Sequence, residues 1–119
     1  MKNKILIIDD DKSILGALKM VFEEFDFDSE SISDASETFE IIKKYKPDLI
    51  ILDVLLSGVN GSEICKELKT NELTRNIPVL LLSAHSSVEQ TARDCKAEDF
   101  LSKPFNIDAL IGKVKKLIN

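Results

Sequence analysis

The chain lacks the features that mark membrane and secreted proteins. No apolar run among its 119 residues approaches the roughly 20 residues that a membrane-spanning helix needs. A short basic start leads directly into a strand-like run and then into acids, which is not the pattern of a signal peptide. We therefore expect a cytoplasmic protein with no membrane partner.

Cysteine and histidine are scarce, and positive charge is outnumbered. Cys65 and Cys95 do not form a CxxC motif, and we expect reduced thiols, although the sequence leaves a disulfide open. His85, the single histidine, has no second histidine or cysteine nearby, which argues against a metal role for it. The net charge of −5 argues against direct binding of nucleic acid, because phosphate backbones require clustered Lys and Arg. The lysine clusters at 43–46 and 113–116 fall where helices should end, and there they complement the helix dipole.

Internal repeats, low-complexity segments and linkers are also absent, so we predict a single domain over residues 1–119. Short, continuous apolar runs at residues 4–8, 49–52 and 79–82 are typical of strands buried on both faces of a parallel sheet. Weaker strands are expected at residues 28–32 and around 100–101.

Helical patterns alternate with these strands. The expected helices are a stripe from Ile14 to Phe25, a segment from Ala35 to Tyr45 with Asp34 as N-cap, residues 62–70, residues near 87–95, and residues 107–118 with Asn106 as cap. Five strand–helix units with right-handed crossovers predict an α/β fold, a doubly wound parallel sheet with helices on both faces.

Polar residues follow the predicted strands at their carboxyl ends, which is the edge where open parallel sheets bind ligands. Asp9 and Asp10 follow the first strand, Asp53 the third, Ser83 the fourth and Lys103 the fifth. Clustered carboxylates need a cation, and a set of oxygen ligands suits Mg²⁺. A lysine and a hydroxyl can hold phosphoryl oxygens, and a carboxylate beside Mg²⁺ can accept a phosphoryl group. Each residue alone could be a cap or a surface charge, but their order along the chain favours one site.

Taken together, ILIIDDD (5–11), PDLIILDVLL (47–56), IPVLLLSAH (77–85) and DFLSKPF (99–105) resemble the receiver domain of response regulators in two-component signalling. Gly61, eight residues past Asp53, belongs to the same pattern, and the resemblance covers residues 4–119. It implies a flavodoxin-like fold with five helices and a five-stranded parallel sheet of order 2-1-3-4-5.

The resemblance also implies a phosphoacceptor site. Asp53 would accept phosphoryl from a histidine kinase or a phosphotransfer protein. Asp9, Asp10, Asp53 and the backbone carbonyl of Leu55 would hold Mg²⁺, with Asp10 the more direct ligand. Asp11 would not be a ligand, and we expect it at the start of the first helix, where a negative charge is favourable.

The implied switch lies around the same edge. Ser83 and Lys103 would contact the phosphoryl oxygens, and Phe100 would respond to Ser83 by a change of rotamer. The Lys103–Pro104 bond would be cis. Such a protein is a regulatory phosphoacceptor that assists its own phosphorylation and dephosphorylation, and it is not an enzyme with a separate substrate. Its downstream partner would be an effector protein or a missing output domain, and a phosphorylation-dependent dimer stays open.

Some positions depart from the family pattern. Ser57 stands where proline is frequent, so we expect a looser loop after Asp53. Lys96 stands where glycine is common. The segment from 83 to 103 is a couple of residues shorter than usual, which puts the output face in doubt. Leu55 and His85 occupy positions that tune phosphoryl lifetime, although a plain loop residue is the favoured interpretation of His85.

Other interpretations remain. Asp9-x-Asp11-x-Ser13 also resembles the first motif of haloacid-dehalogenase-type phosphatases, with Asp9 as nucleophile and Asp11 as acid/base. Such enzymes have an acid pair beyond the lysine, where this chain has Asp108 alone, and Asp53 would lack a role. A receiver-like module that is never phosphorylated is a further alternative. A flavin-binding protein would need a hydroxyl- and glycine-rich loop where the acids stand. The sequence does not distinguish a single-domain regulator from an excised receiver.

Overall fold

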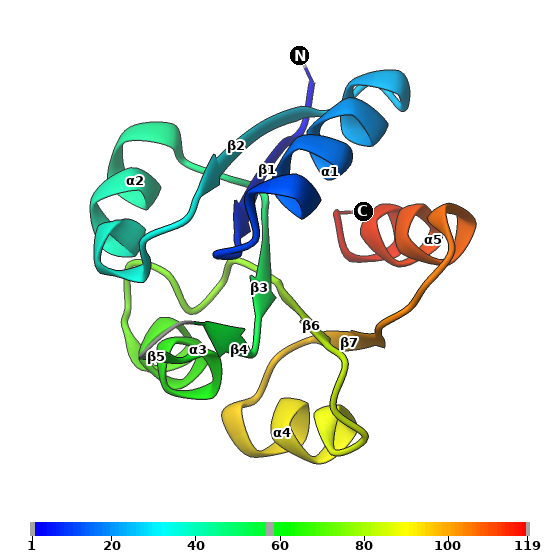
Figure 1. Cartoon of the computed structure of the whole chain (residues 1–119). Helices are drawn as coiled ribbons and strands as arrows, with labels where there is room; N and C mark the ends of the chain where they lie inside the picture. The colour runs from blue at the N-terminus through cyan, green and yellow to red at the C-terminus, as the bar shows by residue number, and fades with distance from the viewer. Residues whose placement is uncertain (1, 57–58, 119) are drawn as a thin grey trace.

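A five-stranded parallel sheet forms the centre of the computed structural model, which describes residues 2–56 and 59–118 (Figure 1). The strand order is β2-β1-β3-β6-β7. Counted along the chain these are the second, first, third, fourth and fifth strands of the sheet, so the predicted order is confirmed. Their bounds are β1 Lys4–Ile8, β2 Asp28–Ile32, β3 Leu49–Asp53, β6 Val79–Ser83 and β7 Asp99–Ser102.

Helices cover both faces of the sheet (Figure 1). Helices α1 and α5 pack on one face, and α2, α3 and α4 pack on the other. Among the described residues, every helix is too short or too polar to cross a membrane. The five predicted helices are present, as α1 Lys12–Glu24, α2 Thr38–Tyr45 with a preceding 3₁₀ turn η1 Ala35–Glu37, α3 Gly61–Thr70, α4 Val88–Cys95 and α5 Ile107–Ile118.

The continuous apolar runs are explained by two separate cores. Successive side chains of a strand point to opposite faces of the sheet. In β1, Ile5 and Ile7 therefore join the core beneath α1 and α5, while Leu6 and Ile8 join the core beneath α2, α3 and α4. In β3 and β6, which are also covered on both faces, polar residues stand only at the carboxyl end.

The edge strands differ from the central ones. Strand β2 has the sequence DSESI, and only Ser29 and Ile32 in it are buried. Charged and hydroxyl side chains on an edge discourage pairing with other chains. The same composition makes β2 a weak strand in the sequence.

Short polar residues start the helices as expected. The Asp11 carboxylate accepts hydrogen bonds from the backbone N–H groups of Ser13 and Ile14 at the start of α1. Asp34 caps η1, and Asn106 accepts from the Ala109 N–H at the start of α5. Capping by the Asp11 side chain satisfies N–H groups that have no partner within the helix.

The connections hold two departures from the expected pattern. Leu55–Leu56 (β4) pairs antiparallel with Val59–Asn60 (β5), a two-residue ladder that the sequence did not predict. Lys96 ends the short helix α4 with φ of 64°. Glycine adopts this left-handed conformation most readily, which accounts for the frequent glycine at this position in similar sequences. The expectation of a looser loop at Ser57 lies outside the described residues.

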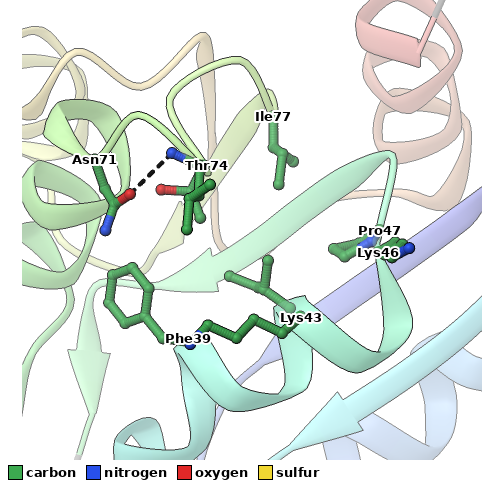
Figure 2. A pocket seen from close by; sticks show the side chains of 9 residues that line it. Phe39, Lys43, Lys46, Pro47, Asn71, Thr74 and Ile77 are labelled. Atoms are coloured by element: carbon green, nitrogen blue, oxygen red, sulfur yellow. Dashed lines mark hydrogen bonds between the residues drawn. The ribbon is translucent and has the colours of Figure 1, made fainter.

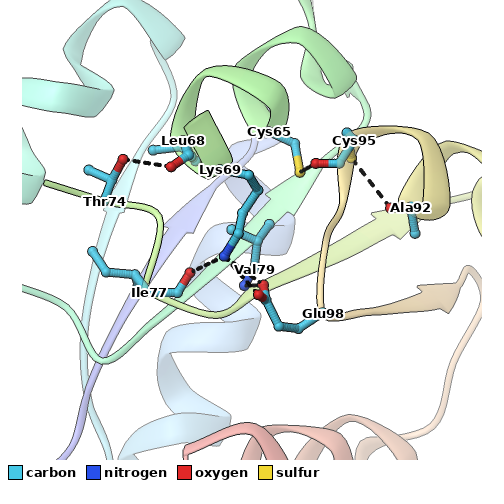
Figure 3. A network of polar contacts seen from close by, with 9 residues as sticks. All are labelled: Cys65, Leu68, Lys69, Thr74, Ile77, Val79, Ala92, Cys95 and Glu98. Carbon is cyan, nitrogen blue, oxygen red and sulfur yellow. Dashed lines mark hydrogen bonds and ion pairs between the residues drawn. The ribbon is translucent and has the colours of Figure 1, made fainter. Parts of the chain in front are cut away.

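A polar network joins α3, the start of β6 and the connection between α4 and β7 (Figure 3). The Lys69 ammonium lies 2.7 Å from Oε2 of Glu98 and 3.0 Å from the carbonyl oxygen of Ile77. Oε1 of Glu98 accepts from the Val79 N–H at 2.8 Å. Nearby, Cys65 and Cys95 are buried free thiols, and Sγ of Cys65 lies 3.4 Å from the carbonyl oxygen of Cys95.

Candidate functional site

Three carboxylates meet at the carboxyl ends of β1 and β3. Ile8 pairs with Leu52 in the sheet, so the residues that follow β1 lie beside the last residue of β3. Asp9, Asp10 and Asp53 each present an oxygen within 4.8 Å of the other two. The sheet therefore brings together the three side chains that the sequence predicts as metal ligands.

Asp9 is almost completely buried, with 1% of its surface exposed. Its Oδ1 accepts a hydrogen bond from the Asp11 N–H at 3.0 Å. Its Oδ2 accepts no hydrogen bond from the described residues, although the Lys103 ammonium lies 3.5 Å away. A buried carboxylate oxygen without a hydrogen bond is costly, and a cation offsets that cost.

Asp53 is buried beside Asp9. The same Lys103 ammonium lies 3.5 Å from Oδ2 of Asp53, and the Leu55 N–H lies 3.4 Å from Oδ1. Burial first, and then the charge of Asp9, raise the pKa of Asp53 above the ordinary aspartate value, while Lys103 acts in the opposite direction. One ammonium 3.5 Å from two carboxylates is farther than the 2.7–2.9 Å of a close charged hydrogen bond. One ammonium cannot balance three clustered carboxylates, so an oxygen-rich cluster of this kind suits a divalent cation.

Ser83 and Lys103 border the carboxylates from the next strands of the sheet. Ser83 ends β6, is 1% exposed, and accepts the His85 N–H on its Oγ at 3.0 Å. The Lys103 N–H donates to the carbonyl oxygen of Ser83 at 2.8 Å, which ties the residue after β7 to the end of β6. The Lys103–Pro104 peptide bond is cis.

Leu55 and His85 lie at one hollow beside the site. Both line a cavity of about 220 Å³ that Ser83 also borders. Leu55 is 62% exposed, so its side chain does not belong to the core. His85 is exposed, and its Nδ1 lies 2.8 Å from Oγ of Ser87 and accepts the Ser87 N–H. This contact holds the imidazole at the start of α4.

Phe100 is half-buried on β7 and has a partner that the sequence did not reveal. The Lys113 ammonium lies 5.5 Å from the centre of the Phe100 ring, and it also pairs with Asp99 at 2.9 Å. An ammonium at this distance is attracted to the face of an aromatic ring. Lys113 of α5 thus contributes to holding the ring of the expected switch residue.

Gly61 packs directly against the backbone of the site, a contact that its place in the sequence pattern does not indicate. A Cβ atom on Gly61 would lie 2.3 Å from the carbonyl oxygen of Asp53 and 2.8 Å from Cα of Val54. Its N–H donates to the carbonyl oxygen of Val54 at 2.7 Å. The first residue of α3 therefore packs directly against the backbone that carries Asp53, and no other residue fits there without displacement.

Comparisons with known proteins identify the family of the chain. The family model of the response regulator receiver domain matches residues 5–115. The chain is 33% identical to the DNA-binding dual master transcriptional regulator RpaA of Synechocystis, covering 97% of this chain and 48% of RpaA. It is 30% identical to the DNA-binding response regulator MtrA of Mycolicibacterium smegmatis, covering 97% and 50%. It thus spans about half the length of these relatives.

Solved structures show the same fold. A putative response regulator from Chloroflexus aurantiacus superposes with a TM-score of 0.93 at 30% identity, covering 99% of this chain and 98% of that one. The signal receiver domain of a signal transduction histidine kinase from Syntrophus aciditrophicus gives 0.88 at 32%, covering 98% and 89%. The chain belongs to the response regulator receiver domain family, whose members are regulatory phosphoacceptor domains of two-component signalling.

Proposed function

We propose that Asp53 accepts a phosphoryl group from a histidine kinase or a phosphotransfer protein in a Mg²⁺-dependent reaction. The observation that carries the proposal is the cluster of Asp9, Asp10 and Asp53 oxygens within 4.8 Å, with the Lys103 ammonium 3.5 Å from both Asp9 and Asp53. Asp9, Asp10, Asp53 and the carbonyl oxygen of Leu55 would hold the ion. When bound, Mg²⁺ supplies positive charge that neutralises the carboxylates and the transferred phosphoryl group.

The chain's own residues provide the remainder of the chemistry. A carboxylate oxygen of Asp53 forms a bond to phosphorus while the bond from phosphorus to the donor's imidazole nitrogen breaks, and that nitrogen keeps the electron pair. The Lys103 ammonium is close enough to Asp53 to move onto a phosphoryl oxygen. Positioning and charge neutralisation contribute most to transfers of this kind.

Ser83 would convert phosphorylation into a change of shape. Its Oγ accepts the His85 N–H, so the hydroxyl proton can donate to a new phosphoryl oxygen. Ser83 is buried at the start of the connection to α4, so turning its side chain toward Asp53 disturbs that connection. A shift between two arrangements of the face around α4 and β7, including Phe100, would then be available to a downstream protein or to an output domain. A phosphorylation-dependent dimer through this face is part of the same proposal.

The decisive experiment is phosphorylation by a small acyl phosphate with Mg²⁺, measured by intact mass. Wild-type protein should gain one phosphoryl group, and Asp53→Asn or a chelator should abolish the gain. Asp11→Asn is the matched control, because Asp11 caps α1 next to the site and should leave labelling unchanged. Labelling that survives in Asp53→Asn but is lost in Asp9→Asn would favour the phosphatase alternative. A wild-type chain that is never labelled would favour a passive interaction module.

Leu55 supports a narrower proposal on the lifetime of the phosphoryl group. Leu55 follows Asp53 by two residues, and its exposed side chain lines the hollow that Ser83 borders, where an apolar group would hinder the approach of water. Leu55→Asn should therefore change the dephosphorylation rate, measured as loss of the added mass with time. His85→Ala tests the second tuning position in the same assay. An unchanged lifetime in both variants would contradict these roles.

A further inference from the structure

A groove at the opposite end of the sheet has no role in the phosphoacceptor site. It has a volume of about 550 Å³ and lies between α2 and the turn at residues 71–77 (Figure 2). Pro47 and Ile77 line it, and each lies two residues before a strand, β3 or β6. The groove is thus at the amino ends of strands whose carboxyl ends carry Asp53 and Ser83. Five residues of strand, about 15 Å, separate the two places.

Apolar side chains form the floor of the groove. Phe39 and Ile42 come from α2, and Ile77 comes from the facing segment. Leu73 stands at the rim with 78% of its surface exposed. A groove of this size is within the range of about 300–1,000 Å³ that small-molecule sites occupy, and an apolar group that covers Phe39 and Leu73 would remove their surface from water.

The charged residues at the groove have one sign. Lys43 and Lys46 line it, and none of its lining residues is acidic. Within the described residues, neither lysine has a carboxylate at ion-pair distance. Lys44, the neighbour of Lys43, instead pairs with Glu40 at 3.5 Å and does not line the groove. Two uncompensated cations on this wall stand out in a chain with a net charge of −5.

The neutral polar groups of the groove also favour a ligand that accepts hydrogen bonds. Oδ1 of Asn71 already accepts the Leu73 N–H at 2.9 Å, so the amide offers its NH₂ group (Figure 2). The Thr74 hydroxyl already donates to the carbonyl oxygen of Leu68 at 2.7 Å. The groups that Lys43, Lys46 and Asn71 leave available are therefore donors.

We propose that this groove binds a small organic anion with an apolar body, such as an alkyl or aryl carboxylate or sulfonate. The apolar part lies on Phe39, Ile42 and Leu73, and the anionic head lies between Lys43 and Lys46. The site is independent of phosphorylation at Asp53, so its test uses unphosphorylated protein without Mg²⁺.

The probes are anilinonaphthalene sulfonate, followed by its fluorescence, and decanoate as a competitor. Both should bind, and amide chemical-shift changes should cluster on α2 and residues 71–77. Lys43→Glu with Lys46→Glu should weaken binding about tenfold, because two attractive charges become repulsive. The matched control is Lys44→Glu with Lys116→Glu, which changes the net charge by the same amount at exposed residues outside the groove and should alter affinity less than twofold. Decanol, which lacks the charge, should compete poorly.

Other outcomes would overturn the proposal. Equal loss of binding in the control pair Lys44→Glu with Lys116→Glu and in the groove pair Lys43→Glu with Lys46→Glu would indicate attraction to overall charge. Equal competition by decanol and decanoate would leave an apolar groove without anion selectivity. Shift changes spread over the whole surface would exclude a site at this groove. Leu73→Asp, a change at an exposed residue, supplies a second variant that should weaken binding if the groove pair fails to fold.

Discussion

Two clusters of charged side chains at opposite ends of the sheet differ in how their charges are paired. At the amino end of β6, Lys69 and Glu98 are paired at 2.7 Å, and both also bond to the backbone. At the carboxyl end of β1, Oδ2 of the buried Asp9 accepts no hydrogen bond from the described residues, and Lys103 is shared between Asp9 and Asp53. The charges of Lys69 and Glu98 are satisfied within the chain, unlike those of the two lysines at the nearby groove, and this pair serves stability. At the second end, the carboxylates of Asp9 and Asp53 share one ammonium and leave room for a bound cation, which serves function.

The largest expected loss of stability comes from a steric clash at the carboxyl end of the sheet. Gly61→Ala would place a methyl group 2.3 Å from the Asp53 carbonyl oxygen, and backbone must move. We expect a loss of about 3 kcal/mol in the free energy of unfolding, measured in urea, and slower phosphorylation. Gly16→Ala is the matched control, because nothing lies within 4 Å of its added Cβ. That helical change should stabilise the protein by about 0.5–1 kcal/mol, and a similar loss in both variants would contradict the steric cause.

Removing the Lys69–Glu98 ion pair at the amino end should lower the free energy of unfolding without changing the rate of phosphorylation. Lys69→Met leaves Glu98 without its ammonium partner, and 36% of the Glu98 side chain is exposed, so water can partly replace it. We expect a loss of about 2 kcal/mol in urea unfolding, below the value for a fully buried pair. Phosphorylation by an acyl phosphate should proceed as in wild type. The exposed Lys66→Met on the same helix should change stability by less than about 0.5 kcal/mol, and a slower phosphorylation of Lys69→Met would show that the two ends are not separate.

Adding Mg²⁺ should stabilise the carboxyl end alone. An ion that binds only the folded chain raises the free energy of unfolding by about 1.4 kcal/mol when its free concentration is ten times Kd. The measurement is urea unfolding with Mg²⁺ and with a chelator. Lys69→Met should keep the full increment, whereas Asp10→Asn should lose most of it. An equal increment in Asp10→Asn would place the ion elsewhere.

The smallest effect concerns pH with metal removed. Burial and Asp9 raise the pKa of Asp53 in the folded chain, so between the ordinary aspartate pKa and this raised value the folded state binds more protons than the unfolded state. The contribution of Asp53 to stability therefore falls as pH rises through that window. Asp53→Asn removes the effect, so its advantage over wild type in urea should grow with pH from about 4 upward. A difference that stays constant with pH would contradict the raised pKa.

The central strands could be predicted because burial on both faces leaves a direct mark on the sequence. Residues 5–8, 49–52 and 79–82 are continuous apolar runs, and the structure places strands there. β2 was a weak prediction because an edge strand carries polar residues such as Asp28 and Glu30. The β4–β5 pairing was missed, since two residues per strand form no pattern.

The residues of the candidate site that directly follow strands could be predicted from the sequence. Parallel strands place the residues that follow them along one edge, which brings Asp9, Asp53 and Lys103 together. The contact of Gly61 with the Asp53 backbone and that of Lys113 with Phe100 could not be predicted. Both depend on how a helix packs against its neighbours, and no local pattern records that packing.

The order of the strands also has a consequence for synthesis on the ribosome. The carboxylates of the site come from positions 9, 10 and 53, but the ammonium that lies between Asp9 and Asp53 comes from position 103. A nascent chain that has exposed only its first half therefore contains all three acids but not their lysine. Because β7 is the last strand of the sheet to emerge, the proposed phosphoacceptor site is complete only after residue 103 has left the ribosome.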